Sequence, residues 1–248
     1  MIALNIPMKE LLEHRVNLVS EVKRYLGYSN LEPDEDICRA IRVAIEEMSH
    51  HCSPKSEILT FPMHIDEKNH VVSIEKINFK IQSKSLSQFL TGFQEIAIFA
   101  ATLGLQADQL IKRESFVNLT QSLILDATAS VLIEEACNFA EKTFRSELRV
   151  KKRGLSERFS PGYWDLSIEL QPVILKILNA SKTLGIYTTD RFQLIPSKSI
   201  TAFMGINSDE KILPEISSSE RNIYSVKCQN CYHHERCFYL KKGEICEF

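Results

Sequence analysis

Residues 157–165 read Glu-Arg-Phe-Ser-Pro-Gly-Tyr-Trp-Asp, and this stretch says most about the fold and chemistry of the chain. Its centre, Ser-Pro-Gly-Tyr at 160–163, is typical of a type II turn, because proline fixes the second φ and glycine supplies the positive third φ. Such a turn brings its end Cα atoms within about 7 Å of each other. Arg158 lies just before it, so we expect a guanidinium, free backbone groups and a phenol on one patch. An ordinary surface turn is the alternative interpretation.

The sequence upstream of this turn is helical. Residues 115–148 contain no glycine or proline and are rich in Ala, Leu and Glu, which predicts one long helix or two abutting helices. Further upstream, apolar spacing predicts N-terminal helices within residues 8–52. A hairpin turning at residues 66–69 and a buried strand over 95–102 are expected between them.

Downstream, an amphipathic helix is expected to end near Gly185, and two strands are expected at 192–195 and 200–206. Helices therefore come first, and strands and helices then mix without regular alternation. This order favours an α+β fold with an antiparallel sheet over a doubly wound parallel sheet.

Composition excludes several classes of function. The chain has 248 residues, is 44% hydrophobic and carries a formal charge of -2, with both signs interspersed. No basic patch for nucleic acid and no polybasic membrane segment stands out. The N-terminal residues do not resemble a signal peptide, and the longest apolar run is too short to span a bilayer. We therefore expect a cytoplasmic protein.

The seven cysteines are unevenly distributed. Cys38, Cys52 and Cys137 lie singly in helical patterns, where a small buried apolar role is expected. The other four crowd the C-terminal stretch and, with His233 and His234 between them, could bind zinc or an iron-sulfur cluster: Cys228, Cys231, Cys237 and Cys246. Their spacing fits no standard cluster motif. Unligated thiols and redox disulfides remain as alternatives.

The pattern Arg-x-x-x-Gly-Tyr at 158–163 resembles the S-adenosylmethionine (AdoMet) binding motif of the reactivation domain of cobalamin-dependent methionine synthase. Similar stretches follow in the order seen in stand-alone members: Asp165 and Gln171, residues 184–186 and 196–199, and upstream 101–104 and 126–134. The resemblance covers about residues 26–207. It implies an α+β domain at 1–224, with a mixed or antiparallel twisted sheet packed against long helices, and a short Cys-rich tail at 225–248.

The resemblance also implies the site residues. Arg158 would clamp the AdoMet carboxylate, the backbone around Phe159 and Ser160 would read the adenine, and Gly162 would form the turn. Tyr163 would lie beside the sulfonium and the approaching corrin, and it is the expected catalytic residue. The positive ligand also needs an acid, and Glu134 on the long helix matches the family's glutamate. Its alternative is a solvated helix face, as expected for its neighbour Glu135.

Three further positions keep two interpretations each. Lys198 and Ser199 match the family pattern, but a purely structural turn would explain them equally well. Trp164 is the only tryptophan of the chain and could either flank the site or pack.

The implied function is reactivation of a methionine synthase in trans. The domain would bind AdoMet and support reductive methylation of cob(II)alamin, carried by the partner, to methylcobalamin, with flavodoxin or ferredoxin as electron donor. Two alternatives are an AdoMet-dependent reactivator of another corrinoid methyltransferase and a non-catalytic AdoMet-binding regulator. The sequence lacks a Gly-rich phosphate loop and the Asp-x-His-x-x-Gly motif of corrinoid-binding domains. We therefore do not expect the chain to hold cobalamin by itself.

Overall fold

The computed structural model describes residues 2–13, 18–28 and 33–208, all within the first compact unit of the chain, Met1–Glu210. Its main sheet is antiparallel at every pairing and has the strand order β4-β3-β2-β5-β9-β6, with β1 also paired to β2. The strands are β1 (Ile2–Asn5), β2 (Lys55–Asp66), β3 (Val71–Ile74), β4 (Phe79–Gln82), β5 (Glu95–Thr102), β6 (Gly154–Leu155) and β9 (Ser199–Asn207). Strands β7 (Tyr187–Thr188) and β8 (Leu194–Ile195) form a separate pair.

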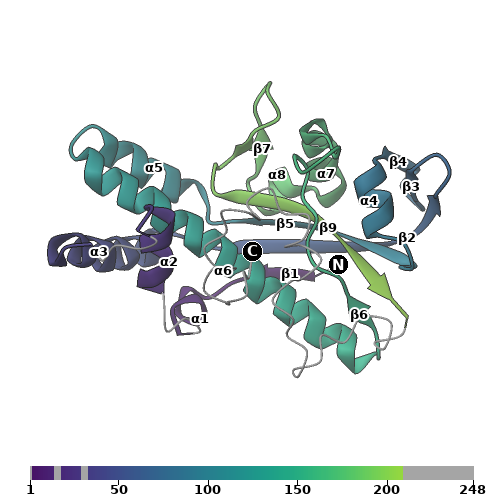
Figure 1. Ribbon diagram of the computed structural model, residues 1–248, viewed down its shortest axis with the longest axis horizontal. Helices are drawn as coiled ribbons and strands as arrows, with labels where there is room; N and C mark the ends of the chain where they lie inside the picture. Colours follow the sequence, from purple (N-terminus) through teal and green to yellow (C-terminus); the bar gives the residue numbers. More distant parts are fainter. Residues whose placement is uncertain (1, 14–17, 29–32, 209–248) are drawn as a thin grey trace. The chain divides into compact units, whose positions relative to one another are not determined.

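Helices cover both faces of this sheet, and the longest, α6, runs diagonally across the strands (Figure 1). The helices are α1 (Met8–Glu13), α2 (Leu18–Tyr25), α3 (Glu35–His51), α4 (Lys84–Phe89), α5 (Leu105–Ser115), α6 (Leu119–Val150), α7 (Gln171–Leu178) and α8 (Ala180–Thr183), with a 3-10 turn at Ile168–Leu170. Asp34 caps the start of α3, because its side chain accepts a hydrogen bond from the Ile37 amide at 2.8 Å.

The strands separate two apolar cores. In β5, Ala97, Phe99 and Ala101 pack toward the core that contains α3, α5 and α6, whereas Ile96 and Ile98 pack toward α4, α7 and α8. Both sets are fully buried, because successive side chains of a strand point to opposite faces and both faces are covered. The same alternation decides where the residues of the candidate site point.

The α+β class and the antiparallel sheet predicted from the sequence are confirmed. The predicted strand at 95–102 coincides with β5, and the long helix predicted over 115–148 is α6, which begins at Leu119. Helix α5 and strands β1, β6 and β7 were not predicted. The three strands are two to four residues long, too short to show a period of two.

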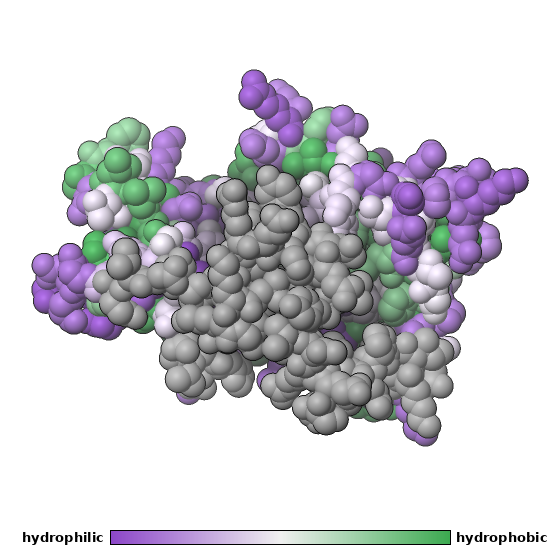
Figure 2. Space-filling model, in the orientation of Figure 1, coloured by the Kyte–Doolittle hydropathy of each residue, from purple (hydrophilic) through white to green (hydrophobic). Residues whose placement is uncertain are grey.

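Apolar side chains are exposed at the turn between α5 and α6. Phe116 and Val117 are about 80% exposed there, and Leu119 and Leu123 follow at the start of α6. Figure 2 shows the apolar colour gathered over this end of the two helices, at the upper left. No helix in the described part of the chain combines the length and apolarity needed to cross a membrane.

Candidate functional site

The Ser-Pro-Gly-Tyr turn has the geometry predicted from its sequence. The Tyr163 amide donates to the Ser160 carbonyl at 3.4 Å, and Gly162, in the third position, has a φ of +95°. The Gly162 amide also donates to the Leu166 carbonyl at 2.8 Å, which closes the loop from its far side. The loop is therefore a fixed structure, held by its own backbone.

The chain entering the turn is extended, so Arg158 and Phe159 point to opposite faces of the sheet. The N–H and C=O of Phe159 both pair with the backbone of Phe203 in β9, at 2.8 Å each. The Phe159 ring is buried in the core of α4 and α7, and Arg158 reaches α6 on the other face. Strand β9 thus already engages the Phe159 backbone, and its role in reading an adenine edge stays a prediction.

The Arg158 side chain is only 15% exposed and is surrounded by polar side chains of α6. Its Nη2 donates to Asn138 Oδ1 at 2.8 Å and lies 3.4 Å from Glu134 Oε2, and its Nε lies 3.3 Å from Glu141 Oε2. Residues 134, 138 and 141 lie on one face of the helix because 3.6 residues make one turn. The structure therefore brings together Arg158 and Glu134, which are 24 residues apart in sequence.

These contacts keep the guanidinium charged. Burial acts to lower the pKa of Arg158, but the Cys137 sulfur and the carboxylates of Glu134 and Glu141 outweigh it and raise that pKa. The Cys137 thiol behaves differently: it is fully buried, and burial raises its pKa to about 12 although Arg158 acts in the opposite direction. The thiol is therefore neutral near pH 7 and buried, as expected, like Cys52, and it also hydrogen-bonds the Arg158 guanidinium.

Glu135 is not solvated as expected, and it is more buried than Glu134. Glu135 is buried and accepts a hydrogen bond from Asn138 at 3.1 Å, whereas Glu134 is partly exposed and faces Arg158. Tyr25 of α2 also lies near Glu134: burial and then the Glu134 carboxylate raise the Tyr25 pKa. Glu134 therefore borders a polar site and does not lie on a freely solvated helix face.

Asp165 fixes the far end of the turn to another element. Its Oδ1 accepts from the Ser83 hydroxyl at 2.8 Å and its Oδ2 from the Lys84 amide at 2.6 Å, at the N-terminus of α4. Partial desolvation acts to raise the pKa of Asp165, but hydrogen bonds from Ser85, Ser83 and Lys84 outweigh it and lower that pKa to about 2. The carboxylate is thus an anchor for the turn, 82 residues from Ser83 in sequence.

Tyr163 and Trp164 present an aromatic surface beside this anchored turn. Both side chains are 64% exposed. Trp164 has a φ of +49°, in the left-handed region, and its ring centroid lies 5.2 Å from that of Phe159, which in turn lies 5.0 Å from Phe89. The tryptophan thus packs on one side and flanks the turn on the other, so both sequence interpretations describe part of its environment.

Lys198 and Ser199 connect the start of β9 to neighbouring elements, away from the Arg158 site. Lys198 Nζ lies 2.8 Å from Asp126 Oδ1 and 2.9 Å from Ser130 Oγ, both on α6. Ser199 Oγ donates to Thr102 Oγ1 at 2.8 Å. These contacts fasten the start of β9 to α6 and β5, which supports the structural interpretation of the two residues.

Sequence reasoning missed Asn138, Glu141 and Arg145. Arg145 Nη2 contacts Glu141 Oε1 at 2.6 Å, and its guanidinium donates to the carbonyls of Leu155 and Ser156. The signal for all three was their spacing of 4, 7 and 11 residues from Glu134, which places them on its helix face. That this helix face contacts Arg158 becomes clear only from the tertiary structure.

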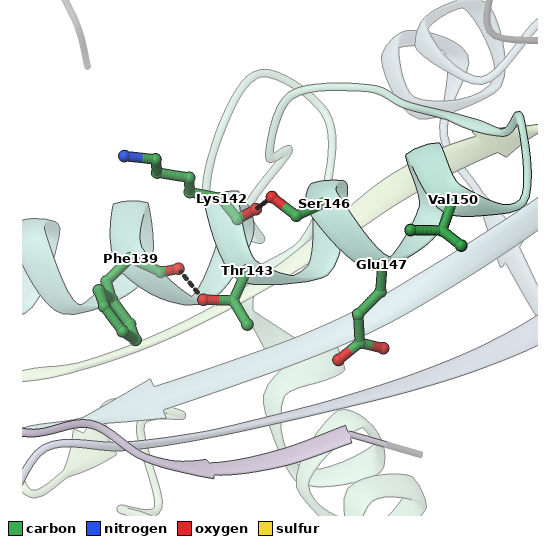
Figure 3. Close-up of a pocket in the computed structure, with 6 residues that line it drawn as sticks. All are labelled: Phe139, Lys142, Thr143, Ser146, Glu147 and Val150. Atoms are coloured by element: carbon green, nitrogen blue, oxygen red, sulfur yellow. Dashed lines mark hydrogen bonds between the residues drawn. The ribbon is translucent and has the colours of Figure 1, made fainter.

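A hollow of about 490 Å³ lies along the second half of α6 but away from this site (Figure 3). It is lined by Phe139, Lys142, Thr143, Ser146, Glu147 and Val150. The Thr143 and Ser146 hydroxyls donate to carbonyls of their own helix, at 2.9 Å each. The lining also includes the charged Lys142 and Glu147, and none of the predicted site residues lines the hollow.

Within residues 2–13, 18–28 and 33–208, no group of three or more His, Cys, Asp or Glu side chains could hold a metal ion. The predicted ligands Cys228, Cys231, Cys237 and Cys246 lie outside the described residues, as does the predicted domain boundary at 224.

The fold of this chain is shared with a solved structure, although its sequence matches no known family. No family model matches the sequence, and no curated protein matches it. Among solved structures, the chain is similar to the MetH reactivation domain bound to AdoHcy, with a TM-score of 0.60 over 82% of this chain and 77% of that chain. The chain has the fold of the MetH reactivation domain. Only 16% of the residues are identical, so the likeness establishes the fold, and ligand and activity are inferred from the site.

Proposed function

We propose that this chain binds AdoMet and supports reductive methylation of cob(II)alamin on a cobalamin-dependent methionine synthase, as a separate reactivation subunit. The observation that carries the proposal is the paired Arg158 and Glu134 beside an anchored Ser-Pro-Gly-Tyr turn, on the fold of the MetH reactivation domain. That solved domain holds AdoHcy, which is AdoMet without its transferable methyl group.

The charges at the site match those of the methionine end of AdoMet. The planar guanidinium of Arg158 suits the ligand carboxylate, and the Glu134 carboxylate suits the ammonium. Both side chains are mostly shielded from water, so each charge needs a partner of opposite sign. The amino acid end of AdoMet, which carries both a carboxylate and an ammonium, supplies both partners.

The turn would bind the rest of the ligand. The N–H of Ser160 would meet an adenine edge, since the Ser160 carbonyl accepts from the Tyr163 amide and the backbone groups of Phe159 pair with β9. Gly162 holds the positive φ that aligns them, and the exposed Tyr163 would lie beside the sulfonium. The Phe159 ring would contribute indirectly, because it packs against Trp164 beside the turn.

The chemistry needs positioning more than acid-base catalysis. One electron reduces cob(II)alamin, and the cobalt then takes the methyl group of AdoMet as the carbon–sulfur bond breaks, which gives methylcobalamin and S-adenosylhomocysteine. We propose a flavodoxin or ferredoxin as the electron donor. This chain would contribute by holding the sulfonium methyl at the exposed Tyr163 surface, where a corrin carried by another protein can approach it.

A methyl-transfer assay tests the function directly. The protein is mixed with AdoMet, a low-potential reductant and a methionine synthase loaded with cob(II)alamin, and methylcobalamin is followed by its visible spectrum. We expect methylcobalamin to form only when both proteins are present. Methyl transfer only to a different corrinoid methyltransferase would identify the other reactivator class. AdoMet binding without transfer to any corrinoid protein would identify a regulator.

A further inference from the structure

The three α6 side chains that hold Arg158 differ in how firmly they are themselves held. Glu141 lies between two guanidinium groups, with Oε2 at 3.3 Å from Arg158 and Oε1 at 2.6 Å from Arg145. Asn138 is fixed on both sides, since it accepts from Arg158 at 2.8 Å and donates to Glu135 at 3.1 Å. Both side chains are therefore bound into a network that extends beyond the site.

Glu134 is held more loosely. Its contact with Arg158, at 3.4 Å, is the longest of the three, and its side chain is the most exposed of the carboxylates around the guanidinium. In the described part of the chain its carboxylate has no other hydrogen-bond donor. Replacing this contact therefore breaks no second hydrogen bond of Glu134 within the described residues.

We infer that Glu141 and Asn138 are positioning residues for Arg158 and that Glu134 is its exchangeable partner. This inference rests on the proposed AdoMet function. On binding, the ligand carboxylate replaces Glu134 on the guanidinium, and the freed Glu134 carboxylate takes the ligand ammonium. After the exchange, the carboxylate and ammonium of the ligand and the charges of Arg158 and Glu134 are all paired, so neither side chain is left as an uncompensated ion.

The donors of the guanidinium are consistent with this exchange. Arginine has five N–H donors: one on Nε and two on each Nη. Glu141 engages Nε, and Asn138 takes one hydrogen of Nη2. The Cys137 sulfur also hydrogen-bonds the guanidinium. Once Glu134 turns away, the Nη2 donor that it engaged is released to bind the ligand carboxylate. Arg145 keeps Glu141 in place and also holds the backbone at Leu155 and Ser156, close before Arg158.

The test compares AdoMet with decarboxylated AdoMet, which lacks only the carboxylate. Binding of both ligands is measured by calorimetry to the wild-type chain, Glu141→Gln, Asn138→Ala and the control Glu147→Gln, an exposed glutamate on another face of α6. We expect Glu141→Gln to weaken AdoMet binding about tenfold and Asn138→Ala by about threefold to tenfold. Binding of decarboxylated AdoMet should change less than about twofold, since neither residue touches the remaining ligand. The control should bind both ligands like the wild type.

A double variant separates positioning from a general structural role. In the Arg158→Ala background, Glu141→Gln should cause no further loss of AdoMet binding, because its effect acts through the guanidinium. Equal losses for both ligands, or an undiminished loss in the Arg158→Ala background, would overturn the inference. Alanine is a good helix former, so the Asn138→Ala variant should fold. Its binding of the two ligands therefore tests the positioning role even if Glu141→Gln does not fold. If the wild-type chain binds neither ligand, the proposed function fails, and the positioning inference fails with it.

Discussion

Glu134 Oε2, on helix α6, lies 3.4 Å from Nη2 of Arg158, in the extended segment that enters the turn. Because Asn138 and Glu141 hold the same guanidinium, this pair adds little to the stability of the fold. We expect Glu134→Gln to lower the free energy of unfolding by less than about 1 kcal/mol, as for partly exposed ion pairs. Arg158→Ala should cost about 1–3 kcal/mol, because it leaves several acceptors without their donor. Urea unfolding of both variants measures the difference, and equal costs would show that Glu134 is structural.

Glycine is needed at position 162 because of its positive φ, and not because a side chain there would clash with its neighbours. An added Cβ would meet no atom within 4 Å, but the φ of +95° is strained for other residues. We expect Gly162→Ala to destabilise the protein by about 1–2 kcal/mol. Gly162→Asn should cost less, since asparagine adopts positive φ more readily. Thermal unfolding compares the two, and an alanine variant as stable as the wild type would disprove the strain.

Because the Asp165 carboxylate caps α4, the thermal stability of the protein should depend on pH in the acidic range. The folded pKa is about 2, below the ordinary 3.8, so the stabilisation is fully present above about pH 4. It is lost as the pH falls from about 4 to about 2, because the carboxylate then becomes protonated. Asp165→Asn should therefore show a shallower loss of melting temperature across this window than the wild type. Parallel profiles for the two proteins would contradict the assigned hydrogen bonds.

The C-terminal cysteines give a prediction from sequence alone. We expect Cys228, Cys231 and Cys237, with Cys246 or a neighbouring histidine, to bind one metal centre. Four thiolates in a short segment suit zinc or an iron-sulfur cluster, and metal binding can order a segment too short for its own core. Anaerobic purification, elemental analysis and a visible spectrum provide the measurement. Less than about a tenth of an equivalent of zinc or iron would leave the thiols unligated or disulfide-bonded.

Much of the fold could be predicted because its long elements carry a clear period or composition. Strand β5 is an unbroken apolar run, and the α6 segment lacks glycine and proline from end to end. The short strands β1 and β6 exist because they pair with longer neighbours, at Ile58 and Ile206 among others. Such pairing is a property of the tertiary structure and leaves no local pattern in the sequence.

The candidate site could be predicted in part. The turn, Arg158 and Glu134 follow from turn chemistry and family resemblance, and the structure brings them together. The pairing of the Phe159 backbone with β9 was not predicted, because its partner Phe203 lies 44 residues away and no local sequence pattern indicates the bridge. Asn138 and Glu141 were overlooked for the related reason that polar residues on a helix acquire a role only from what packs opposite them.

The most direct test of the central claim is calorimetric titration of AdoMet, without cobalamin, into the wild-type chain, Arg158→Ala and the control Arg191→Ala, an exposed arginine outside the site. We expect the wild type and the control to bind one equivalent with equal affinity. Arg158→Ala should bind about 10- to 100-fold more weakly, which corresponds to about 1.5–3 kcal/mol for a hydrogen bond to a charged group. Unchanged affinity in Arg158→Ala, or no binding by the wild type, would contradict AdoMet recognition at this site.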